Sequence, residues 1–207
     1  MRLYAAFVYL FLYIPIAVIA IFSFNAGRNA SDFVGFSVKW YGKALDNPFI
    51  MDALKTSLTV ALLSALFASV FGAMAAVALQ GIRGPVRTAF DALINVAVMI
   101  PGIVIGIATL IGLVTIFEQL NPLIDAIWPF ASDAPRLQMG KASLVAAHTM
   151  FLMALCIIIV RARLAGMDRS LTEASSDLYA TPFGTFVQVT LPLIFPAILA
   201  GFLLSFT

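Results

Sequence analysis

Five long apolar runs constrain the fold of this 207-residue chain more than any other feature. They cover residues 5–24, 57–79, 92–117, 143–160 and 186–206. A helix needs about 20 residues to cross the hydrocarbon core of a bilayer, and every run is close to or above that length. We therefore predict an all-α integral membrane protein with five transmembrane helices, in which residues 1–207 form a single transmembrane domain.

The composition agrees with a membrane location. Hydrophobic residues make up 62% of the chain and charged residues only 11%, whereas soluble domains carry about 25% charged residues. The net charge of +2 is too small to suggest a nucleic-acid partner. The single cysteine, Cys156, excludes both a disulfide framework and a cysteine metal site within one chain. Residues 5–24 exceed the apolar length of a signal peptide and precede no cleavage site, so we expect an uncleaved span.

Small residues recur at helical spacing in three of the runs. In lipid, short side chains allow helix backbones to approach closely, and such faces typically lie at helix–helix contacts. We therefore predict packing faces in the second, third and fifth spans. The residues are Ser64, Ala68, Gly72 and Ala76; Gly102 and Gly106; and Ala197, Gly201 and Ser205.

Few ionisable residues lie in or beside the runs. His148, next to Thr149 in the fourth run, is either a functional group or a neutral side chain bonded to a neighbouring helix. Glu118, Asp125 and Asp133 follow the third run, and we assign them to an outer loop. There we favour an ordinary solvated face over a rim that collects cations.

A charged segment from Arg161 to Pro192 separates the last two runs. Ser170 and Glu173 have the spacing of a capping box, which predicts a helix start at Ser170. Thr181 followed by Pro182 predicts a second start, with a hydroxyl cap and proline at the first helical position. Two short capped helices fit either a docking surface for a soluble partner or an ordinary polar connector, and the local signals alone favour the connector.

Motifs for catalysis are missing from the sequence. It contains no phosphate-binding G-x-x-x-x-G-K-[ST] loop, so the chain does not hydrolyse ATP by that route. It also lacks the H-E-x-x-H, nucleophile-elbow and dinucleotide-binding patterns. We expect a non-catalytic membrane subunit.

The spacing from Glu173 to Pro192 resembles the EAA loop of binding-protein-dependent ABC importer permeases. In that family the loop forms cytoplasmic coupling helices that dock on the ATP-binding subunit, here over residues 161–185. Tyr179 replaces the usual glycine, and a left-handed turn costs tyrosine about 1–2 kcal/mol, so we expect Pro182 and Gly184 to carry the bend instead. The predicted docking residues are Ser170, Glu173, Ala174, Ser175, Leu178, Tyr179, Ala180, Pro182, Gly184, Leu191 and Pro192.

Further motifs narrow the resemblance to the spermidine/putrescine importer permeases. They are Tyr13-Ile14-Pro15, Ser23-Phe24-Asn25, Gly35-Phe36, Lys39-Trp40-Tyr41, Ser57-Leu58 and Met99-Ile100-Pro101. The resemblance implies a type I ABC importer permease-like helix bundle that moves solute by alternating access. It implies a second permease subunit, two ATP-binding subunits that hold ATP and Mg, and an external solute-binding protein. The location it implies is a bacterial inner membrane, with the N-terminus in the cytoplasm.

Alternatives remain open at this point. Permeases for phosphonate, sulfate or iron share the general plan, and a secondary transporter, a channel subunit or a membrane scaffold are rivals from other classes. The family has a sixth span after Ser205-Phe206-Thr207, so we expect a C-terminally truncated permease domain. In that case the face formed by Ala197, Gly201 and Ser205 would lack its packing partner.

Overall fold

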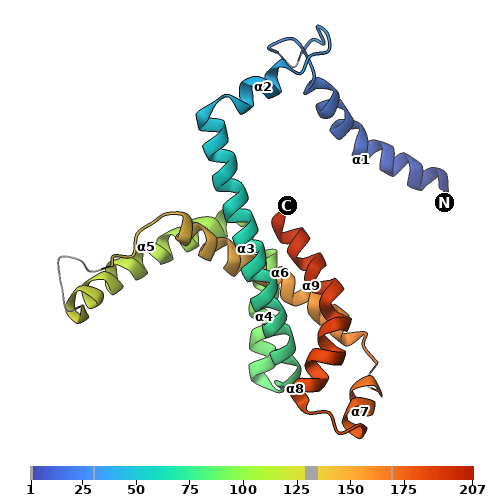
Figure 1. The fold of residues 1–207 in the computed structure, drawn as a ribbon, viewed down its shortest axis with the longest axis vertical. Coiled ribbons are helices and arrows are strands. Elements are labelled where there is room, and N and C mark those ends of the chain that lie inside the picture. The colour runs from blue at the N-terminus through green and yellow to red at the C-terminus, as the bar shows by residue number, and fades with distance from the viewer. Residues whose placement is uncertain (1, 30, 129–134, 169) are drawn as a thin grey trace. The chain divides into compact units, whose positions relative to one another are not determined.

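The structure is a computed structural model that describes residues 2–29, 31–128, 135–168 and 170–207. Within these residues, every secondary-structure element longer than an isolated bridge is a helix. Five stretches are long and apolar enough to cross a membrane, which confirms the predicted number: Leu3–Phe22, Pro48–Gly81, Gly102–Ile127, Lys141–Ala165 and Pro182–Phe206. The elements are α1 (Arg2–Phe22), α2 (Lys39–Leu45), α3 (Pro48–Gly81), α4 (Pro85–Met99), α5 (Gly102–Ile127), α6 (Lys141–Ala165), α7 (Ser170–Asp177), α8 (Pro182–Thr185), the π-helical turn η2 (Phe186–Thr190) and α9 (Leu191–Phe206) (Figure 1).

The chain divides into two compact units, Met1–Thr56 and Ser57–Thr207. In the first unit, the buried Asn25 side chain organises the loop that follows α1. Its Oδ1 accepts hydrogen bonds from the N–H groups of Gly27 and Val34 at 3.1 and 2.9 Å. Its Nδ2 donates to the carbonyl oxygens of Asn29 and Asp32 at 3.1 and 2.7 Å. One side chain therefore satisfies four backbone groups of a loop whose other regular pairing is an isolated antiparallel bridge between Asn25 and Phe36.

Aromatic contacts close the same unit. Phe24 stacks on Phe36 with ring centroids 5.0 Å apart, and Tyr41 Oη donates to Ser23 Oγ at 2.7 Å. Trp40 Nε1 donates to the carbonyl of Gly27 at 3.1 Å. Three of the motifs that carried the narrower resemblance, Ser23-Phe24-Asn25, Gly35-Phe36 and Lys39-Trp40-Tyr41, thus contact one another although they are separate in sequence.

The core of the second unit lies where α3, α4, α6 and α9 meet, and α6 and α9 run side by side (Figure 1). The helices α3, α6 and α9 contribute aliphatic side chains at helical spacing, so one stripe of each faces the core, whereas α4 contributes Ile94. The buried members are Ala73, Ala76, Leu79, Ile94, Ala154, Ile157, Val160, Leu164, Ile194 and Ala197.

The third apolar run is not one helix, contrary to the prediction for residues 92–117. The helix α4 ends at Met99, and α5 begins at Gly102. Between them Ile100 has an extended backbone with ψ 133°, and Pro101 has ψ 132°. Proline disfavours the helical conformation in the residue before it, which explains why the break falls at Ile100. Hydropathy alone did not predict this break, because the segments on both sides of it are hydrophobic.

Two other boundaries differ from expectation. The helix α3 begins at Pro48 rather than at residue 57, because Asn47 Oδ1 accepts from the backbone N–H of Phe49 at 3.0 Å and caps the start. The assignment of Glu118 and Asp125 to a loop is wrong, since α5 continues to Ile127. Asp133 lies outside the described residues.

The small-residue faces of α3 and α9 both pack against α6. Ser64, Ala68, Gly72 and Ala76 are buried, and a Cβ atom added at Gly72 would lie 2.6 Å from Cys156 Cβ. One added at Gly201 would lie 3.2 Å from Cys156 Sγ. The expectation that the face of Ala197, Gly201 and Ser205 lacks a packing partner is therefore wrong. By contrast, Gly102 and Gly106 have open space around them within the described chain, and their packing role stays a prediction.

Candidate functional site: the loop between α6 and α9

The segment after α6 starts with a side-chain cap. The predicted start of α7 at Ser170 is confirmed, but the cap lies two residues earlier than expected. Asp168 Oδ1 accepts from the backbone N–H of Ser170 at 2.9 Å, and the Asp168 carbonyl accepts from Leu171 N–H at 3.3 Å. The hydrogen bond from the Ser170 backbone lowers the pKa of Asp168 below its usual value. The carboxylate therefore stays ionised at the positive end of α7.

The end of α7 is a Schellman motif built on tyrosine. Ala180 N–H donates to Ser175 O at 3.1 Å, and Tyr179 N–H donates to Ser176 O at 2.9 Å. This motif needs a left-handed residue after the helix, and Tyr179 has φ +59°. The prediction that Pro182 and Gly184 would carry the bend instead is wrong. Tyr179 takes the glycine's conformation because the two hydrogen bonds satisfy carbonyls that would otherwise be unpaired.

The second short helix starts as predicted. Thr181 Oγ1 accepts from Gly184 N–H at 3.1 Å, with Pro182 at the first helical position. Ser175 Oγ and Thr185 Oγ1 lie 2.9 Å apart and tie α7 to α8. The substitution of serine for the usual alanine of the EAA pattern thus supplies a hydrogen bond between the two helices.

Large apolar side chains point outward at the tip of this loop. Leu178 is 82% exposed, Tyr179 96% and Phe183 76%. The helix α7 itself buries no residue, as expected of an element that packs little against its own chain. An apolar cluster on a loop with both helices capped is typical of a surface that another protein covers.

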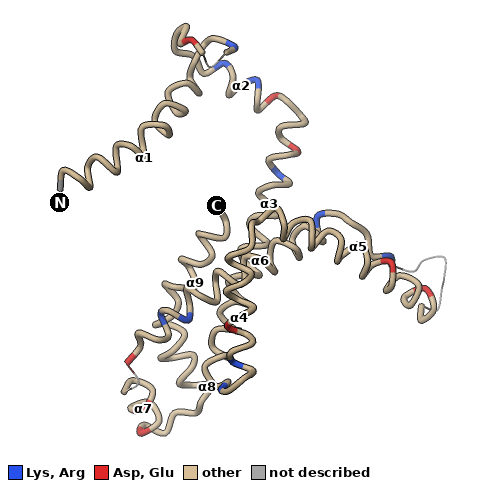
Figure 2. The backbone as a smooth tube through the Cα atoms, turned by 180° about the vertical axis from the view of Figure 1, so that it is seen from behind, with Lys and Arg blue, Asp and Glu red and all other residues tan. Residues whose placement is uncertain are grey.

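Charged residues occur along α4, near the end of α6 and in the loop after it, whereas α9 carries none (Figure 2). Several of them line a cavity of about 890 Å³ that touches α3, α4, α6 and α7. Among its lining residues are Arg83, Arg87, Asp91, Arg161, Asp168 and Glu173. Glu173 therefore lies in the first turn of α7 and at the wall of this cavity.

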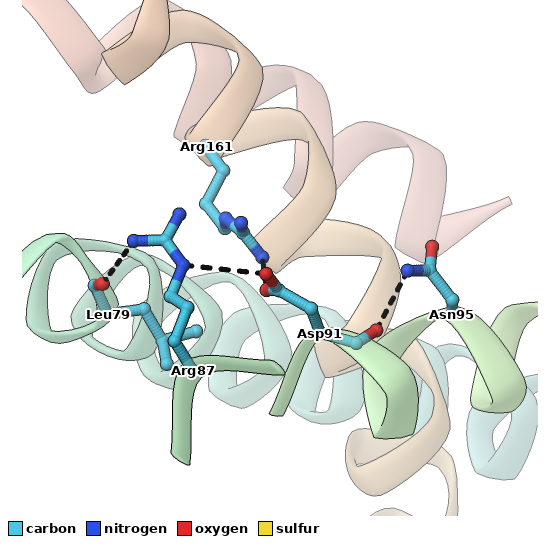
Figure 3. Close-up of polar contacts among 5 residues, drawn as sticks. All are labelled: Leu79, Arg87, Asp91, Asn95 and Arg161. Atoms are coloured by element: carbon cyan, nitrogen blue, oxygen red, sulfur yellow. Dashed lines mark hydrogen bonds and ion pairs between the residues drawn. The ribbon is translucent and has the colours of Figure 1, made fainter. Parts of the chain in front are cut away.

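Asp91, which the sequence reasoning missed, lies at the centre of the cavity's ion pairs (Figure 3). Arg161 Nη1 donates to its Oδ1, and Arg87 Nε donates to its Oδ2 at 3.4 Å. The hydrogen bond from Arg161 is the main reason why the pKa of Asp91 lies below its usual value. The sequence did contain a local signal for this polar cluster, because Arg87, Asp91 and Asn95 are spaced by four and therefore share one face of α4.

Among the described residues, His148 bonds its own helix and not a neighbouring one. Its Nδ1 donates to the carbonyl of Leu144, one turn earlier in α6, at 2.8 Å, and the side chain is exposed. The adjacent Thr149 is buried, and its hydroxyl has no hydrogen-bond partner within the described residues.

Residues 68–207, from within α3 to the end of α9, match the family described as "Binding-protein-dependent transport system inner membrane component". The chain belongs to this family. The predicted resemblance to ABC importer permeases is thereby confirmed, and so is the all-helical membrane fold.

Individual relatives agree with the narrower resemblance. Over 200 residues the chain is 34% identical to the putrescine transport system permease protein PotI of Escherichia coli (strain K12), covering 95% of this chain and 66% of that protein. It is also 34% identical to the spermidine/putrescine transport system permease protein PotC of the same strain, covering 97% and 69%. A molybdate/tungstate transport system permease protein, WtpB of Thermococcus kodakarensis, is 27% identical over 199 residues, covering 96% and 68%. The chain spans about two thirds of the length of these curated relatives.

Proposed function

We propose that this chain is the membrane-spanning permease subunit of an ATP-driven importer for polyamines such as putrescine and spermidine. The observation that carries the proposal is the 34% identity, over at least 95% of the chain, to two permeases whose names specify these solutes. The capped α7–α8 pair gives the proposal a physical site, because its exposed apolar tip suits docking on a soluble subunit.

In the proposed complex, the tip of Leu178, Tyr179 and Phe183 contacts an ATP-binding subunit. ATP and Mg belong to that partner, and this chain contributes no catalytic group. ATP binding draws two such subunits together, the α7–α8 pair moves with them, and the spans open outward. Solute then enters from an external binding protein, and a second permease subunit completes the path.

This arrangement sets the orientation. An ATP-binding subunit is cytoplasmic, so the loop between Ala165 and Pro182 faces the cytoplasm. Five spans alternate in direction, which puts the N-terminus in the cytoplasm as well. The loop of the first unit, organised by Asn25, then faces outward, where a solute-binding protein docks.

The solute test uses the complete complex with its binding protein in proteoliposomes. We expect putrescine or spermidine to stimulate ATP hydrolysis and to be taken up. Stimulation by molybdate in place of polyamines would contradict the polyamine assignment, and the similarity to WtpB makes that comparison informative.

The docking test uses Glu173→Lys, which puts a cation into the first turn of α7 and opposes the helix dipole. We expect normal membrane insertion with loss of solute-stimulated ATP hydrolysis. Asp46→Lys makes the same charge change on an exposed residue of the first unit and serves as the matched control. Unchanged hydrolysis in the Glu173→Lys complex would show that this loop does not couple the subunits.

A further inference from the structure

Asp91 joins the ends of three helices. Its two carboxylate oxygens accept from different guanidinium groups, Arg161 of α6 and Arg87 of α4 itself (Figure 3). Arg87 also donates through Nη1 to the carbonyl of Leu79, in the last turn of α3, at 2.8 Å. The carboxylate thus lies in one continuous network that connects α3, α4 and α6.

This network is a large part of what holds α4 in place. The only fully buried residue of α4 is Ile94, and Ala97, one turn later, is partly buried against the same core, so apolar packing holds this helix along a short stretch near its end. A second, directional contact at Asp91, one turn before Ile94, prevents rotation about that stretch. Both carboxylate oxygens are in use, and charge-assisted hydrogen bonds are about twice as strong as neutral ones.

The position of the ion pair along the chain connects two helix boundaries. Arg161 lies in the last two turns of α6, which leads directly into the α7–α8 pair. Asp91 lies in α4, which ends at the Ile100–Pro101 break before α5. The helix α5 buries none of its residues within the described chain. It contacts α6 and follows α4 through the Ile100–Pro101 link, so a displacement of α4 reaches α5 through that link.

We propose that the Asp91–Arg161 ion pair is a rigid coupling strut, which makes α4 move with α6 and so passes displacement of the α7–α8 pair to the α5 span. This inference rests on the proposed importer function and deepens it. The strut stays closed throughout the transport cycle, and the extended Ile100–Pro101 link absorbs the change in angle. Asp91 and Arg161 are therefore positioning residues that touch no solute.

The first test is Asp91→Asn in the complete complex. The amide keeps one acceptor oxygen but turns an NH₂ group toward a guanidinium, so one of the two contacts must break. Since coupling between sites amounts to roughly 5–150-fold, we expect solute uptake per ATP hydrolysed to fall about tenfold, with basal hydrolysis and subunit assembly retained. Asp91→Glu keeps the charge and should therefore retain most of the parental ratio of solute uptake to ATP hydrolysis.

A matched control exists in α5. Asp125 has the same side-chain exposure as Asp91, 34%, and pairs with Arg136 at 3.4 Å. Asp125→Asn therefore makes the same chemical change on an ion pair that does not link α4 to α6, and the ratio should stay at the parental value. An Asp91→Asn complex with the parental ratio, or an equal loss in Asp125→Asn, overturns the strut.

The second test replaces the ion pair by a covalent link. Asp91→Cys and Arg161→Cys are combined with Cys156→Ala, and a short bifunctional thiol reagent joins the two new cysteines. A strut that stays closed predicts low coupling before the link forms and recovery after it. Coupling that the link fails to raise, or lowers further, means that α4 and α6 must separate during the cycle and refutes the proposal.

The two tests also separate this inference from the function on which it rests. A parent complex that neither binds an ATP-binding subunit nor takes up solute refutes the proposed function, and the strut with it. An active parent whose coupling is indifferent to Asp91 refutes the strut alone.

Discussion

Replacing Gly72 by alanine tests the packing of α3 on α6 most sharply. The added Cβ would lie 2.6 Å from Cys156 Cβ and 3.2 Å from the carbonyl oxygen of Met153. Carbon atoms prefer separations of about 3.5–4.0 Å, so the two helices must move apart by about 1 Å. Both close atoms are fixed by the α6 backbone, which means that no rotamer change relieves the contact.

The expected loss of stability in Gly72→Ala follows from the cost of overpacking. Inserting a methyl group into a close-packed site costs about 1–3 kcal/mol, while exchanging glycine for alanine within a helix returns up to about 1 kcal/mol. We therefore expect Gly72→Ala to lower the free energy of unfolding by about 1–2 kcal/mol. A Cβ added at Gly106 would have open space within 4 Å among the described residues. Gly106→Ala therefore gains the helix propensity of alanine without a clash, and it should leave the free energy of unfolding unchanged or raise it.

A double-mutant cycle with Cys156→Ala identifies the contact. Alanine keeps Cβ, so it cannot relieve the clash at Gly72, but it removes the Sγ atom that lies 3.2 Å from a Cβ at Gly201. Cys156→Ala should thus rescue Gly201→Ala and not Gly72→Ala. The assay is equilibrium unfolding of the purified protein in mixed micelles, followed by helical circular dichroism. Rescue of Gly72→Ala by Cys156→Ala, or wild-type stability of Gly72→Ala alone, would refute the packing described for α3 and α6.

Three further predictions concern other parts of the chain. Tyr179→Gly should stabilise the protein by about 1 kcal/mol, because glycine adopts φ +59° without strain; an unchanged thermal midpoint would contradict this. Asn25→Ala removes four hydrogen bonds and should destabilise the first unit by about 2–4 kcal/mol, measured as faster proteolysis near Gly27; equal protease resistance would count against it. Asp91 has a lowered pKa, so its ion pair is fully formed above about pH 4 and is lost only as the pH falls through the lowered folded-state pKa. The solute uptake per ATP hydrolysed should therefore be constant from about pH 5 to 8. A pH-dependent step within that range that Asp91→Asn abolishes would contradict this prediction.

The sequence predicts the elements whose signals are local. Length and hydropathy suffice for the five spans, since a bilayer imposes one dimension on all of them. The start of α8 follows from Thr181-Pro182, because a helix start is satisfied by side chains a few residues away. The start of α7 at Ser170 was also predicted correctly, although its cap is the carboxylate of Asp168. These predictions needed no knowledge of tertiary structure.

Contacts between distant residues escaped prediction. Arg161 and Asp91 are 70 residues apart, and neither position signals the other. Tyr179 was misjudged for a different reason, because a left-handed tyrosine is unfavourable when considered alone. The two hydrogen bonds of the Schellman motif offset that strain, and they depend on where α7 ends. Reasoning from propensity alone therefore put the bend at Pro182 and Gly184 rather than at Tyr179.

The helix α6 is the element on which the second unit is assembled. Its Cys156 lies between Gly72 of α3 and Gly201 of α9; an added Cβ would clash at Gly72 and make a tight contact at Gly201. Near its end, Arg163 Nε donates to the carbonyl of Leu193 in α9 at 2.9 Å, and Arg161 pairs with Asp91 of α4. Because close packing and charged hydrogen bonds both resist sliding, α3, α4 and α9 follow α6 as one body. Under the proposed strut, α5 is the span whose angle changes, since it follows the break at Pro101 and buries no residue within the described chain. Two hydrogen bonds between Asn121 and Leu137 hold the far end of α5 to the segment before α6.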